Sequence, residues 1–502
     1  MYLGIDLGTS ELKVVVVDDG HRVVAGAAEQ LVTTRPQPLW SEQDPAHWWA
    51  ALDAAMLRLR ETHPAALASV RAIGPTGQMH GAVLLDAADA VLRPAILWND
   101  GRSARQCAAL EAAAPSLHEI AGNAAMPGFT APKLLWVHEH EPAVFARIAR
   151  VLLPKDWLRL GLTAEHVSEM SDASGTLWLD VGRRAWSDEL LAACHLTRAQ
   201  MPRLVEGSRA SGQLRSALAA RWGLRAGIVV AGGGGDNAAS AIGVGAVRPH
   251  QGFVSLGTSG VCLLVSERFS PNAGAGVHAF CHALPDRWHQ MSVMLSAASA
   301  LRWACAALGI ATEAELLRRV ASLGATERVR APLFLPYLSG DRTPHNDPEA
   351  QGVLFGLTHD HDAAAIGYAV MEGVSFSLLD GWRSLAPERS AVSAMSLIGG
   401  GARSALWAQL LASLLGVAMR VHEHGAAGGA LGAARLAWLA DDGEEDAVCR
   451  VPDVSHEFVS DPAEASLLLP RHDRFCALYR ALRDEFGLRG VAAEAPALAT
   501  AG

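Results

Sequence analysis

Hydrophobic residues at the start of the chain fall into short runs separated by polar turns. Apolar runs occupy 2–5, 13–17 and 23–25, and a Gly-Thr-Ser turn lies between the first two. Short apolar runs bounded by turn residues are typical of strands joined in hairpins. We therefore predict three consecutive strands at the start of the chain, the first two joined by a tight turn.

The hydrophobic period then changes to that of a helix. Asp44 and Pro45 fit the N-cap and the first position of a helix. Apolar residues follow at helical spacing, at Trp48, Trp49, Leu52, Met56 and Leu59. We assign these tryptophans to the core rather than to a ligand site. Hairpins followed by a helix are the opening pattern of an actin-like, ribonuclease-H-type α/β domain.

Two further apolar runs, 68–73 and 92–97, are predicted strands that carry polar residues to their carboxyl ends. Gln78, Met79 and His80 follow the first run, and Trp98, Asn99, Asp100 and Arg102 follow the second. Open α/β sheets bind ligands at the carboxyl ends of their strands. His80 by itself is most simply a structural histidine, and the second group is also typical of a capped turn. Together the two groups offer the aromatic face, amides and charges that hold sugar hydroxyls.

The most informative pattern is a repeated turn. Gly8-Thr9-Ser10 near the start and Gly257-Thr258-Ser259 near the midpoint are each flanked by apolar runs. A hairpin turn of this composition presents N–H and hydroxyl groups together, which suits a phosphate. Two such turns predict a phosphate chain held between two related domains. Only the first turn follows an acid, Asp6 against Ser255, and one carboxylate is what a Mg²⁺ site beside a nucleotide needs.

Glycine-rich turns follow two other apolar runs. Residues 228–231 lead into four glycines, Asp236 and Asn237. The run superficially fits a dinucleotide fingerprint, but the acid expected roughly 20 residues later is missing. Asp236 is either the N-cap of the next helix or a carboxylate on the floor of a cleft that takes a proton from a hydroxyl. The second apolar run ends at Leu397 and Ile398, and Gly400 and Gly401 follow it. Glycines at this place permit close approach by a flat base or a ribose.

Composition limits the class of protein. At 502 residues the chain is long enough for two or more domains, and 50% apolar residues support a large core. The net charge of −10 argues against a nucleic-acid partner. Asp6 interrupts the first apolar run, so we predict no signal segment and expect a cytoplasmic protein. The most apolar long window, 227–247, contains Asp236 and Asn237, which argues against a membrane span.

Cysteine and lysine usage remove some further classes. The seven cysteines have no C-x-x-C spacing, so we expect reduced thiols and neither a disulfide nor a zinc framework. Lysine occurs only at Lys13, Lys133 and Lys155, and none of these lies in a G-x-x-x-x-G-K-[ST] phosphate loop. An ATP site in this chain therefore needs another architecture.

These motifs together resemble the FGGY family of carbohydrate kinases over residues 1–485. The pattern Gly128-x-Thr130-x-x-Lys133 matches the first signature of that family. Other segments that carry the resemblance are 2–14, 39–45, 77–81, 96–102, 126–136, 153–156, 231–238, 255–260, 335–345 and 397–404. The resemblance implies two actin-like domains with a cleft between them, 1–245 for the sugar and 246–485 for the nucleotide. From the alanine-rich stretch at 491–502 we expect residues 486–502 to form a flexible tail.

The resemblance also implies a reaction and roles for individual residues. ATP with Mg²⁺ would phosphorylate the terminal O5 hydroxyl of D-xylulose, a small ketopentose, with Asp236 as the general base. Sugar contacts are expected from Gln78, Met79, His80, Trp98, Asn99, Asp100, Arg102 and Asn237. Nucleotide contacts are expected from Gly8, Thr9, Ser10, Lys13, Gly257, Thr258, Gly400 and Gly401, and Asp6 would organise Mg²⁺. We expect no nucleic-acid or membrane partner, and a homodimer is compatible with the sequence.

Three departures from the family pattern bear on these expectations. Glu11 would repel a triphosphate unless its side chain points outward. The glycine run before Asp236 is one residue longer than the family needs, which could displace the base. Ala365 replaces a polar residue of the second signature, a tolerable change. Two alternatives stay open: a kinase of the same family for ribulose, gluconate or glycerol, and an actin-like ATPase that phosphorylates no sugar.

Overall fold

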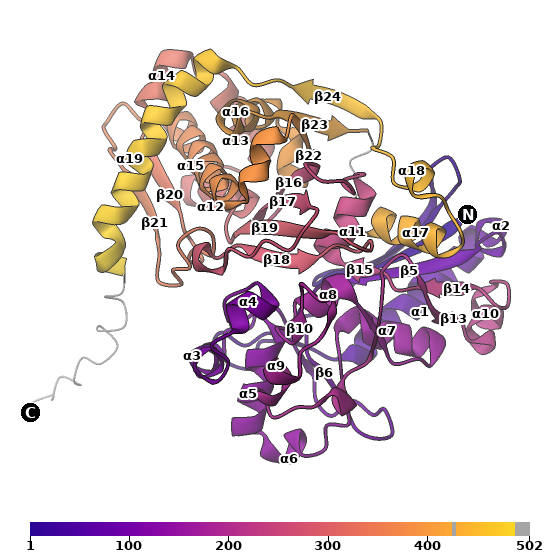
Figure 1. Cartoon of the computed structure of the whole chain (residues 1–502). Coiled ribbons are helices and arrows are strands. Elements are labelled where there is room, and N and C mark those ends of the chain that lie inside the picture. Colours follow the sequence, from indigo (N-terminus) through magenta and orange to yellow (C-terminus); the bar gives the residue numbers. More distant parts are fainter. Residues whose placement is uncertain (424–427, 487–502) are drawn as a thin grey trace, which may run out of the picture.

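The computed structural model describes residues 1–423 and 428–486, and its first half is built on a seven-stranded sheet (Figure 1). The strands are β1 (Tyr2–Leu7), β2 (Glu11–Val17), β3 (Val23–Gln30), β5 (Ala72–Gly77), β13 (Ala210–Gln213), β14 (Val229–Ala231) and β15 (Gly234–Gly235). The order is β13-β14-β5-β1-β2-β3, and β15 also pairs with β5. β1, β2 and β3 are antiparallel neighbours, whereas β5 lies parallel to β1 and β14 parallel to β5.

The second half repeats this arrangement. Its sheet has the order β18-β19-β17-β16-β22-β23-β24. The strands are β16 (Gly252–Leu256), β17 (Gly260–Ser266), β18 (His278–Cys281), β19 (Trp288–Met294), β22 (Ala394–Ile398), β23 (Ala418–His422) and β24 (Val454–Phe458). As in the first sheet, an antiparallel hairpin, β16–β17, continues on its other side into parallel strands. The two Gly-Thr-Ser turns therefore occupy equivalent places, and the predicted pair of actin-like sheets is confirmed.

Helices cover the two large sheets, and within the described residues five two-stranded sheets are formed by segments between the helices and large-sheet strands in the sequence. In the first half the helices are α1 (Pro45–Thr62), α2 (Pro64–Ala68), α3 (Ala104–Ala113), α4 (Leu117–Ala121), α5 (Thr130–His140), α6 (Pro142–Phe145), α7 (Pro154–Thr163), α8 (Met170–Ser174), α9 (Asp188–Ala192) and α10 (Ser216–Trp222). Later helices are α12 (Ala298–Leu308), α13 (Glu313–Ala321), α14 (Ala325–Arg330), α15 (Ala363–Ser384), α16 (Ala405–Leu415), α18 (Glu445–Val448) and α19 (Pro462–Phe486). The two-stranded sheets are β4 (Glu42–Gln43) with β7 (Ala95–Ile96), β6 (Val83–Leu85) with β8 (Arg150–Leu152), β9 (Val167–Glu169) with β12 (Arg203–Val205), β10 (Leu179–Asp180) with β11 (Ala185–Trp186), and β20 (Leu333–Pro336) with β21 (Gly352–Phe355).

Local sequence patterns predicted some element boundaries correctly and others wrongly. α1 begins at Pro45 as predicted, and the Asp44 carboxylate accepts a hydrogen bond from the Ala46 N–H at 2.9 Å. The predicted strand over 68–73 was wrong at its start, because Pro64 opens the short helix α2 and β5 begins only at Ala72. The predicted strand over 92–97 shrinks to β7, outside the large sheet. Pro94 cannot donate a ladder hydrogen bond, which limits that strand.

Two helices form the layer that joins the sheets, α11 (Asp236–Gly243) and α17 (Gly429–Ala440), which lie side by side in Figure 1. α17 belongs to the second half of the sequence but packs on β1 and β5 of the first sheet. The packing brings backbones into direct contact: a Cβ at Gly4 would lie 2.0 Å from the Ala430 oxygen, and one at Gly432 would lie 1.7 Å from the Ala239 oxygen. Glycine is therefore required where these elements meet.

Two further features concern the core and the end of the chain. α15 is long and apolar enough to span a membrane, yet 83% of its most apolar window is buried inside the protein, as expected of a core helix. The predicted tail over 486–502 lies outside the described residues, except that Phe486 ends α19.

Candidate active site

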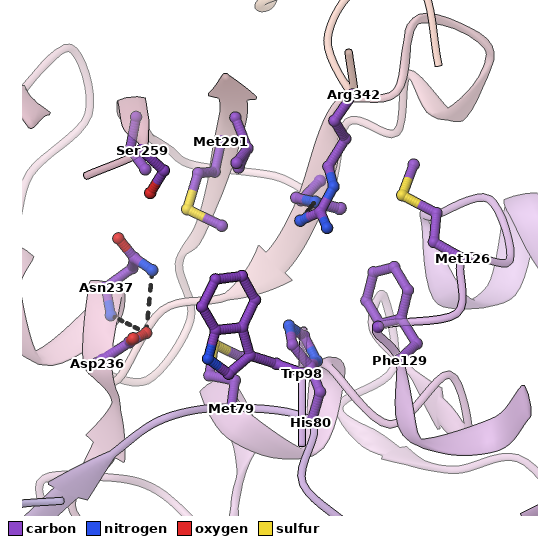
Figure 2. A pocket seen from close by; sticks show the side chains of 14 residues that line it. Met79, His80, Trp98, Met126, Phe129, Asp236, Asn237, Ser259, Met291 and Arg342 are labelled. Carbon is purple, nitrogen blue, oxygen red and sulfur yellow. Dashed lines mark hydrogen bonds between the residues drawn. The ribbon is translucent and has the colours of Figure 1, made fainter. Parts of the chain in front are cut away.

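A cavity of about 130 Å³ lies between the two halves (Figure 2). It brings together five residues predicted from the sequence: Met79, His80, Trp98, Asp236 and Asn237. The second half contributes Ser259, Val261, His278, Met291, Val293 and Arg342, and the remaining lining residues are Met126, Gly128 and Phe129. Aromatic and sulfur-containing walls with a few polar groups are typical of a small-ligand site.

Asp236 is the carboxylate of this cavity. It is the first residue of α11, and Gly235 rather than Asp236 is the N-cap, so the side chain is not used as a helix cap. The Asp236 Oδ1 accepts hydrogen bonds from the backbone N–H of Asn237 at 2.7 Å and from its side-chain amide at 2.9 Å. Burial raises the pKa of Asp236 to about 6, although both hydrogen bonds oppose the shift. A carboxylate with this pKa is ionised at neutral pH and well suited to accept a proton.

The four glycines before Asp236 step away from the sheet and return to it. Gly233 has φ of 81°, and a Cβ there would lie 1.9 Å from the Pro75 oxygen. Gly234 and Gly235 then pair with β5 as β15. The long glycine run is accommodated by this step, and Asp236 still reaches the cavity.

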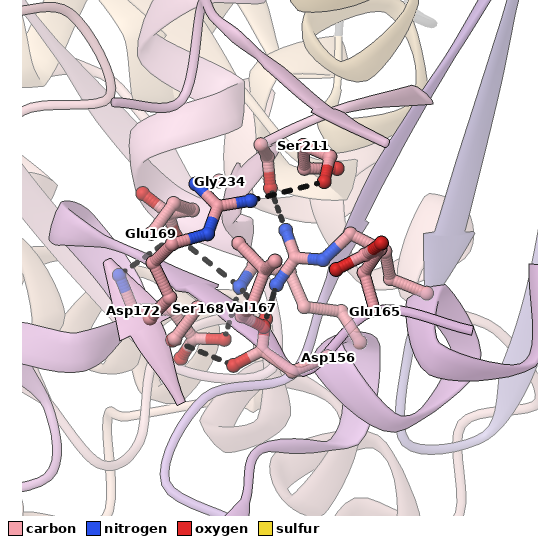
Figure 3. A network of polar contacts seen from close by, with 12 residues as sticks. Asp156, Glu165, Val167, Ser168, Glu169, Asp172, Ser211 and Gly234 are labelled. Atoms are coloured by element: carbon pink, nitrogen blue, oxygen red, sulfur yellow. Dashed lines mark hydrogen bonds and ion pairs between the residues drawn. The ribbon is translucent and has the colours of Figure 1, made fainter. Parts of the chain in front are cut away.

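A fully buried charge cluster lies behind the glycine run (Figure 3). The Lys155 Nζ lies 2.7 Å from Asp156 Oδ1, 3.3 Å from Glu169 Oε1 and 2.9 Å from Asp172 Oδ2. Arg159 also pairs with Asp156. All five side chains are buried, so each charge depends on these partners in place of water.

The cluster holds both ends of the glycine run. Arg159 donates a hydrogen bond to the Gly232 oxygen at 2.5 Å. The Gly235 N–H donates to Ser171 Oγ at 3.0 Å, and the Ser171 hydroxyl in turn donates to Glu169. The position of the backbone that enters Asp236 therefore depends on the charge cluster.

Three acids face two cations in this cluster, so one proton balances the charge. Burial raises the pKa of Asp172 to about 8, and the negative charges of Asp156 and Glu169 add to the shift. Burial lowers the pKa of Lys155, but the surrounding carboxylates outweigh it, so the pKa stays above its ordinary value. The raised pKa favours the protonated form of Asp172, and the surrounding carboxylates keep Lys155 charged.

His80 presents a neutral imidazole to the cavity. Its φ of 69° is unusual for a residue with a side chain, a strain typical of functional sites. Burial, with help from the charge of Lys133, lowers the pKa of His80 to about 3. Because the ring is neutral and its Nδ1 lies 2.7 Å from the Gly175 oxygen, we assign the proton to Nδ1. The Nε2 is then able to accept a hydrogen bond from a ligand hydroxyl.

The signature residues Thr130 and Lys133 hold the backbone of His80 in place. The fully buried Lys133 Nζ donates to the His80 oxygen at 2.8 Å and to the Gly128 oxygen at 2.7 Å. The Thr130 hydroxyl also donates to the His80 oxygen, at 3.1 Å. Burial lowers the pKa of Lys133 to about 7. The signature therefore fixes the backbone on two sides of the cavity.

Gln78 does not line the cavity but connects it to the first Gly-Thr-Ser turn. The Trp98 Nε1–H donates to Thr9 Oγ1 at 2.9 Å, and the Thr9 hydroxyl donates to Gln78 Oε1 at 3.0 Å. Gln78 Nε2 donates to Gln43 Oε1 at 3.0 Å, and Gln43 Nε2 donates to the Thr9 oxygen at 2.6 Å. The turn and the indole of the cavity are thus held in one network.

The other predicted sugar residues after β7 do not line the cavity. Asn99 is exposed to solvent. Arg102 pairs with Asp100 at 2.7 Å, and both side chains are buried. The Arg102 guanidinium lies 3.6 Å from the centre of the Trp40 ring, and Asp100 accepts a hydrogen bond from the Ser41 N–H at 2.6 Å. These contacts attach the loop that carries Trp98 to the segment before α1.

Arg342 is the main cavity residue that the sequence did not reveal. It follows β20 in an irregular loop and points toward the cavity in Figure 2. Its Nη1 lies 3.4 Å from His278 Nε2, and His278 Nδ1 lies 3.0 Å from Asn123 Oδ1. Burial lowers the pKa of Arg342 to about 10, which leaves it charged at neutral pH. The site therefore combines one cation, one carboxylate and neutral polar groups.

The first Gly-Thr-Ser turn lies beside Asp6 at the end of β1. Asp6 is opposite Lys13 across the β1–β2 hairpin. Burial raises the pKa of Asp6 to about 7, the charge of Asp236 raises it further, and Lys13 opposes the shift. Asp6 and Asp236 therefore interact electrostatically. Glu11 lies at the same turn, where its carboxylate accepts a hydrogen bond from Gln30 of β3 at 3.0 Å.

The predicted nucleotide residues of the second half lie together. Gly399 has φ of 88°, and a Cβ there would lie 2.6 Å from the Leu256 oxygen, just before the second turn. A short 3₁₀ helix, Gly400–Arg403, follows directly and packs on β16. The oxygens of Gly257 and Thr258 accept hydrogen bonds from the N–H groups of Ala298 and Ala297, at 2.9 and 3.0 Å. The second turn and the 3₁₀ helix are therefore neighbours at the end of the second sheet.

Two related sheets with equivalent hydroxyl-bearing turns, and a carboxylate in a small cavity that both halves line, are the features of an actin-like carbohydrate kinase. Residues 1–243 match the N-terminal domain of the FGGY family of carbohydrate kinases, and residues 252–440 match its C-terminal domain. The chain therefore belongs to the FGGY family of carbohydrate kinases. A kinase of this family uses ATP as a substrate and a small-molecule sugar as the acceptor.

Relatives extend over nearly the whole chain. The xylulose kinase of Escherichia coli (strain K12) is 51% identical over 484 residues, which cover 96% of this chain and 99% of that protein. The xylulose kinase of Klebsiella pneumoniae is 53% identical over 446 residues, covering 89% of this chain and 91% of the relative. A crystal structure described as a xyloylose kinase from Brucella ovis aligns with a TM-score of 0.92 at 48% identity, covering 96% of this chain and 99% of that chain.

Proposed function

We propose that this protein is a xylulose kinase, which transfers the γ-phosphoryl group of ATP to the O5 hydroxyl of D-xylulose. The observation that carries the proposal is the place of Asp236, a carboxylate of raised pKa in a small cavity lined by both halves of the chain and reached by Ser259 of the second Gly-Thr-Ser turn. The relatives described above support the choice of sugar, since they are xylulose kinases that share 51% and 53% sequence identity with this chain.

The reaction needs a base, a held sugar and a shielded phosphoryl group. Asp236 takes the proton from O5 as that oxygen attacks the γ-phosphorus. The bond between the γ-phosphorus and the β–γ bridging oxygen breaks, and ADP leaves with the electrons of that bond. His80 Nε2 accepts a hydrogen bond from a sugar hydroxyl, while Arg342 donates to sugar oxygens. The two turns supply N–H and hydroxyl groups that stabilise charge developing on the phosphate oxygens. The Thr9 hydroxyl and the Gly8 and Gly257 N–H groups already donate within the protein.

Asp6 is the residue that fits a magnesium ion. Burial raises the pKa of Asp6 to about 7 and the charge of Asp236 adds to the shift, an arrangement that a divalent cation would relieve. Bound there with ATP, Mg²⁺ would neutralise negative charge on the phosphate oxygens. Lys13, opposite Asp6 across the β1–β2 hairpin, would add positive charge to the same site.

A panel of acceptors tests the proposed substrate. ADP release from MgATP is measured with D-xylulose, D-ribulose, L-ribulose, gluconate, glycerol and no sugar. We expect strong stimulation by D-xylulose and weak stimulation by the others. Stimulation by another acceptor alone would retain the kinase and replace the sugar, whereas ADP release without any sugar dependence would favour an actin-like ATPase.

Replacing Arg342 tests the sugar contact that the sequence did not reveal. Arg342→Met should raise the KM for the sugar about 10- to 100-fold, because a hydrogen bond from a charged donor contributes about 1.5–3 kcal/mol. Arg268→Met is the matched control, since the Arg268 side chain is 82% exposed and lies outside the cavity. An unchanged KM in Arg342→Met would remove Arg342 from the sugar site.

The proposal extends to organisation and location. We propose two domains, 1–245 and 246–485, that close on the cavity between them, and a cytoplasmic enzyme, where ATP is available. Closure would exclude water from the phosphoryl group and limit futile ATP hydrolysis.

A further inference from the structure

Three potential metal ligands meet where the last helix packs on the core. Asp380 lies on α15, and His472 and Cys476 lie four residues apart on α19. That spacing puts both α19 side chains on one face of the helix, toward α15. His472 is buried, and Asp380 and Cys476 are partly exposed, so an ion can reach the group from solvent. None of the three side chains lines the sugar cavity.

Against the sequence-based expectation of no zinc framework, we propose that Asp380, His472 and Cys476 bind Zn²⁺ and so fasten α19 to α15. The Cys476 Sγ lies 3.4 Å from His472 Nε2, and 3.8 and 3.9 Å from the two Asp380 oxygens. The His472 Nε2 lies 2.7 Å from Asp380 Oδ1. In tetrahedral zinc with ordinary bond lengths, neighbouring ligand atoms are separated by about 3.3–3.6 Å. Side-chain shifts of a few tenths of an ångström therefore convert this group into a coordination shell.

The donor set selects the class of metal. A thiolate and an imidazole favour zinc over magnesium or calcium, which prefer oxygen ligands. The fourth position is available to the second Asp380 oxygen or to water, since both carboxylate oxygens lie at similar distances from the sulfur.

Binding requires local rearrangement that the structure permits. In the ion-free state His472 Nε2 contacts Asp380, and the Arg383 Nη1 lies 3.4 Å from His472 Nδ1. The proton between Nε2 and the carboxylate and the thiol proton would leave as the ion binds. Arg383 is exposed and free to move toward solvent.

The contacts on either side indicate a stabilising role. One residue before His472, Arg471 forms a buried ion pair with Glu372 of α15 at 2.6 Å. One turn after Cys476, the Tyr479 hydroxyl donates to Asp347 at 2.8 Å. α19 is therefore already docked at both ends of the group, and the ion would strengthen this docking without touching the phosphoryl-transfer site.

Metal titration of the full chain tests the proposal. Protein freed of metal with a chelator is titrated with Co²⁺, whose absorption reports thiolate and imidazole ligands, and then with Zn²⁺ in competition. We expect one equivalent of Co²⁺ with a thiolate charge-transfer band, and a rise of about 2–5 °C in Tm with excess Zn²⁺. Turnover should be unchanged once excess Zn²⁺ is removed from the assay.

Variants separate this site from adventitious binding. Cys476→Ser and Asp380→Asn should each weaken the site at least about 100-fold and abolish the thermal shift. Asp380→Asn retains an oxygen that accepts from His472, so it preserves the ion-free packing. Cys107→Ser, at another partly buried thiol, should bind like the parent protein. An absent thiolate band, or equal binding by parent and Cys476→Ser, would overturn the proposal.

Discussion

Replacing Asp236 with asparagine is expected to lower kcat by about 10² to 10⁴, the range for loss of a general base. Asparagine keeps the size of the side chain and an oxygen for the hydrogen bonds from Asn237. The sugar should therefore still bind, and its KM should change little. Steady-state ADP release at saturating sugar and MgATP measures the effect, and a near-normal kcat would remove Asp236 from the role of base.

The same assignment predicts a pH profile. Only the ionised carboxylate accepts a proton, and burial raises the pKa of Asp236 to about 6. The kcat of the parent enzyme should therefore fall toward tenfold per pH unit below this value. His80 does not contribute to this limb, because its pKa is lowered to about 3. In Asp236→Asn the residual activity should lose the limb near pH 6, and persistence of the limb would assign it to another group.

Replacing Lys155 with methionine is expected to reduce the free energy of unfolding by about 3–5 kcal/mol, the usual effect of removing one partner from a buried ion pair. Asp156, Glu169 and Asp172 would lose the cation that lies within 3.3 Å of each. Their mutual repulsion would then disturb Ser171 and Arg159, which hold the glycine run. The kcat should fall as well, because the backbone entering Asp236 loses its support.

Chemical denaturation and kinetics on the same preparations measure both effects. Asp172→Asn is the matched control: the raised pKa of Asp172 favours its uncharged form, so an uncharged amide should cost much less stability than the loss of Lys155. If the two variants lost equal stability, the proposed placement of the proton would be wrong. A stable Lys155→Met enzyme with normal kcat would show that the cluster does not position Asp236.

Features encoded by neighbouring residues could be predicted from the sequence. The two Gly-Thr-Ser turns lie at equivalent hairpins because turn geometry depends on a few adjacent residues. Asp44 and Pro45 located the start of α1 for the same reason. Met79, His80 and Trp98 all reached the cavity, although β7 is far shorter than the run that predicted it.

Features that depend on distant contacts could not be predicted. Arg342 is a single arginine in a loop, and its partner His278 lies 64 residues away in the sequence. Asp100 and Arg102 have side chains suited to a sugar, but each neutralises the other below the surface. Gln78 is used to connect Thr9 and Gln43 rather than to face the cavity. In each case the role of the side chain depends on how deeply it is buried and on which residue it pairs with. Neither can be read from the amino-acid composition.

The packing of α17 on the first sheet has a consequence for synthesis on the ribosome. Every strand of that sheet is complete once Gly235 has been made, but the helix that covers β1 and β5 ends at Ala440, about 200 residues later. At usual rates of translation this interval lasts roughly 10–40 s. Throughout it Tyr2, Val15 and Val17, which pack against α17 in the finished protein, lack their cover. These apolar side chains can therefore associate wrongly while the chain is being made, and the core of the first half is complete only when α17 has been added.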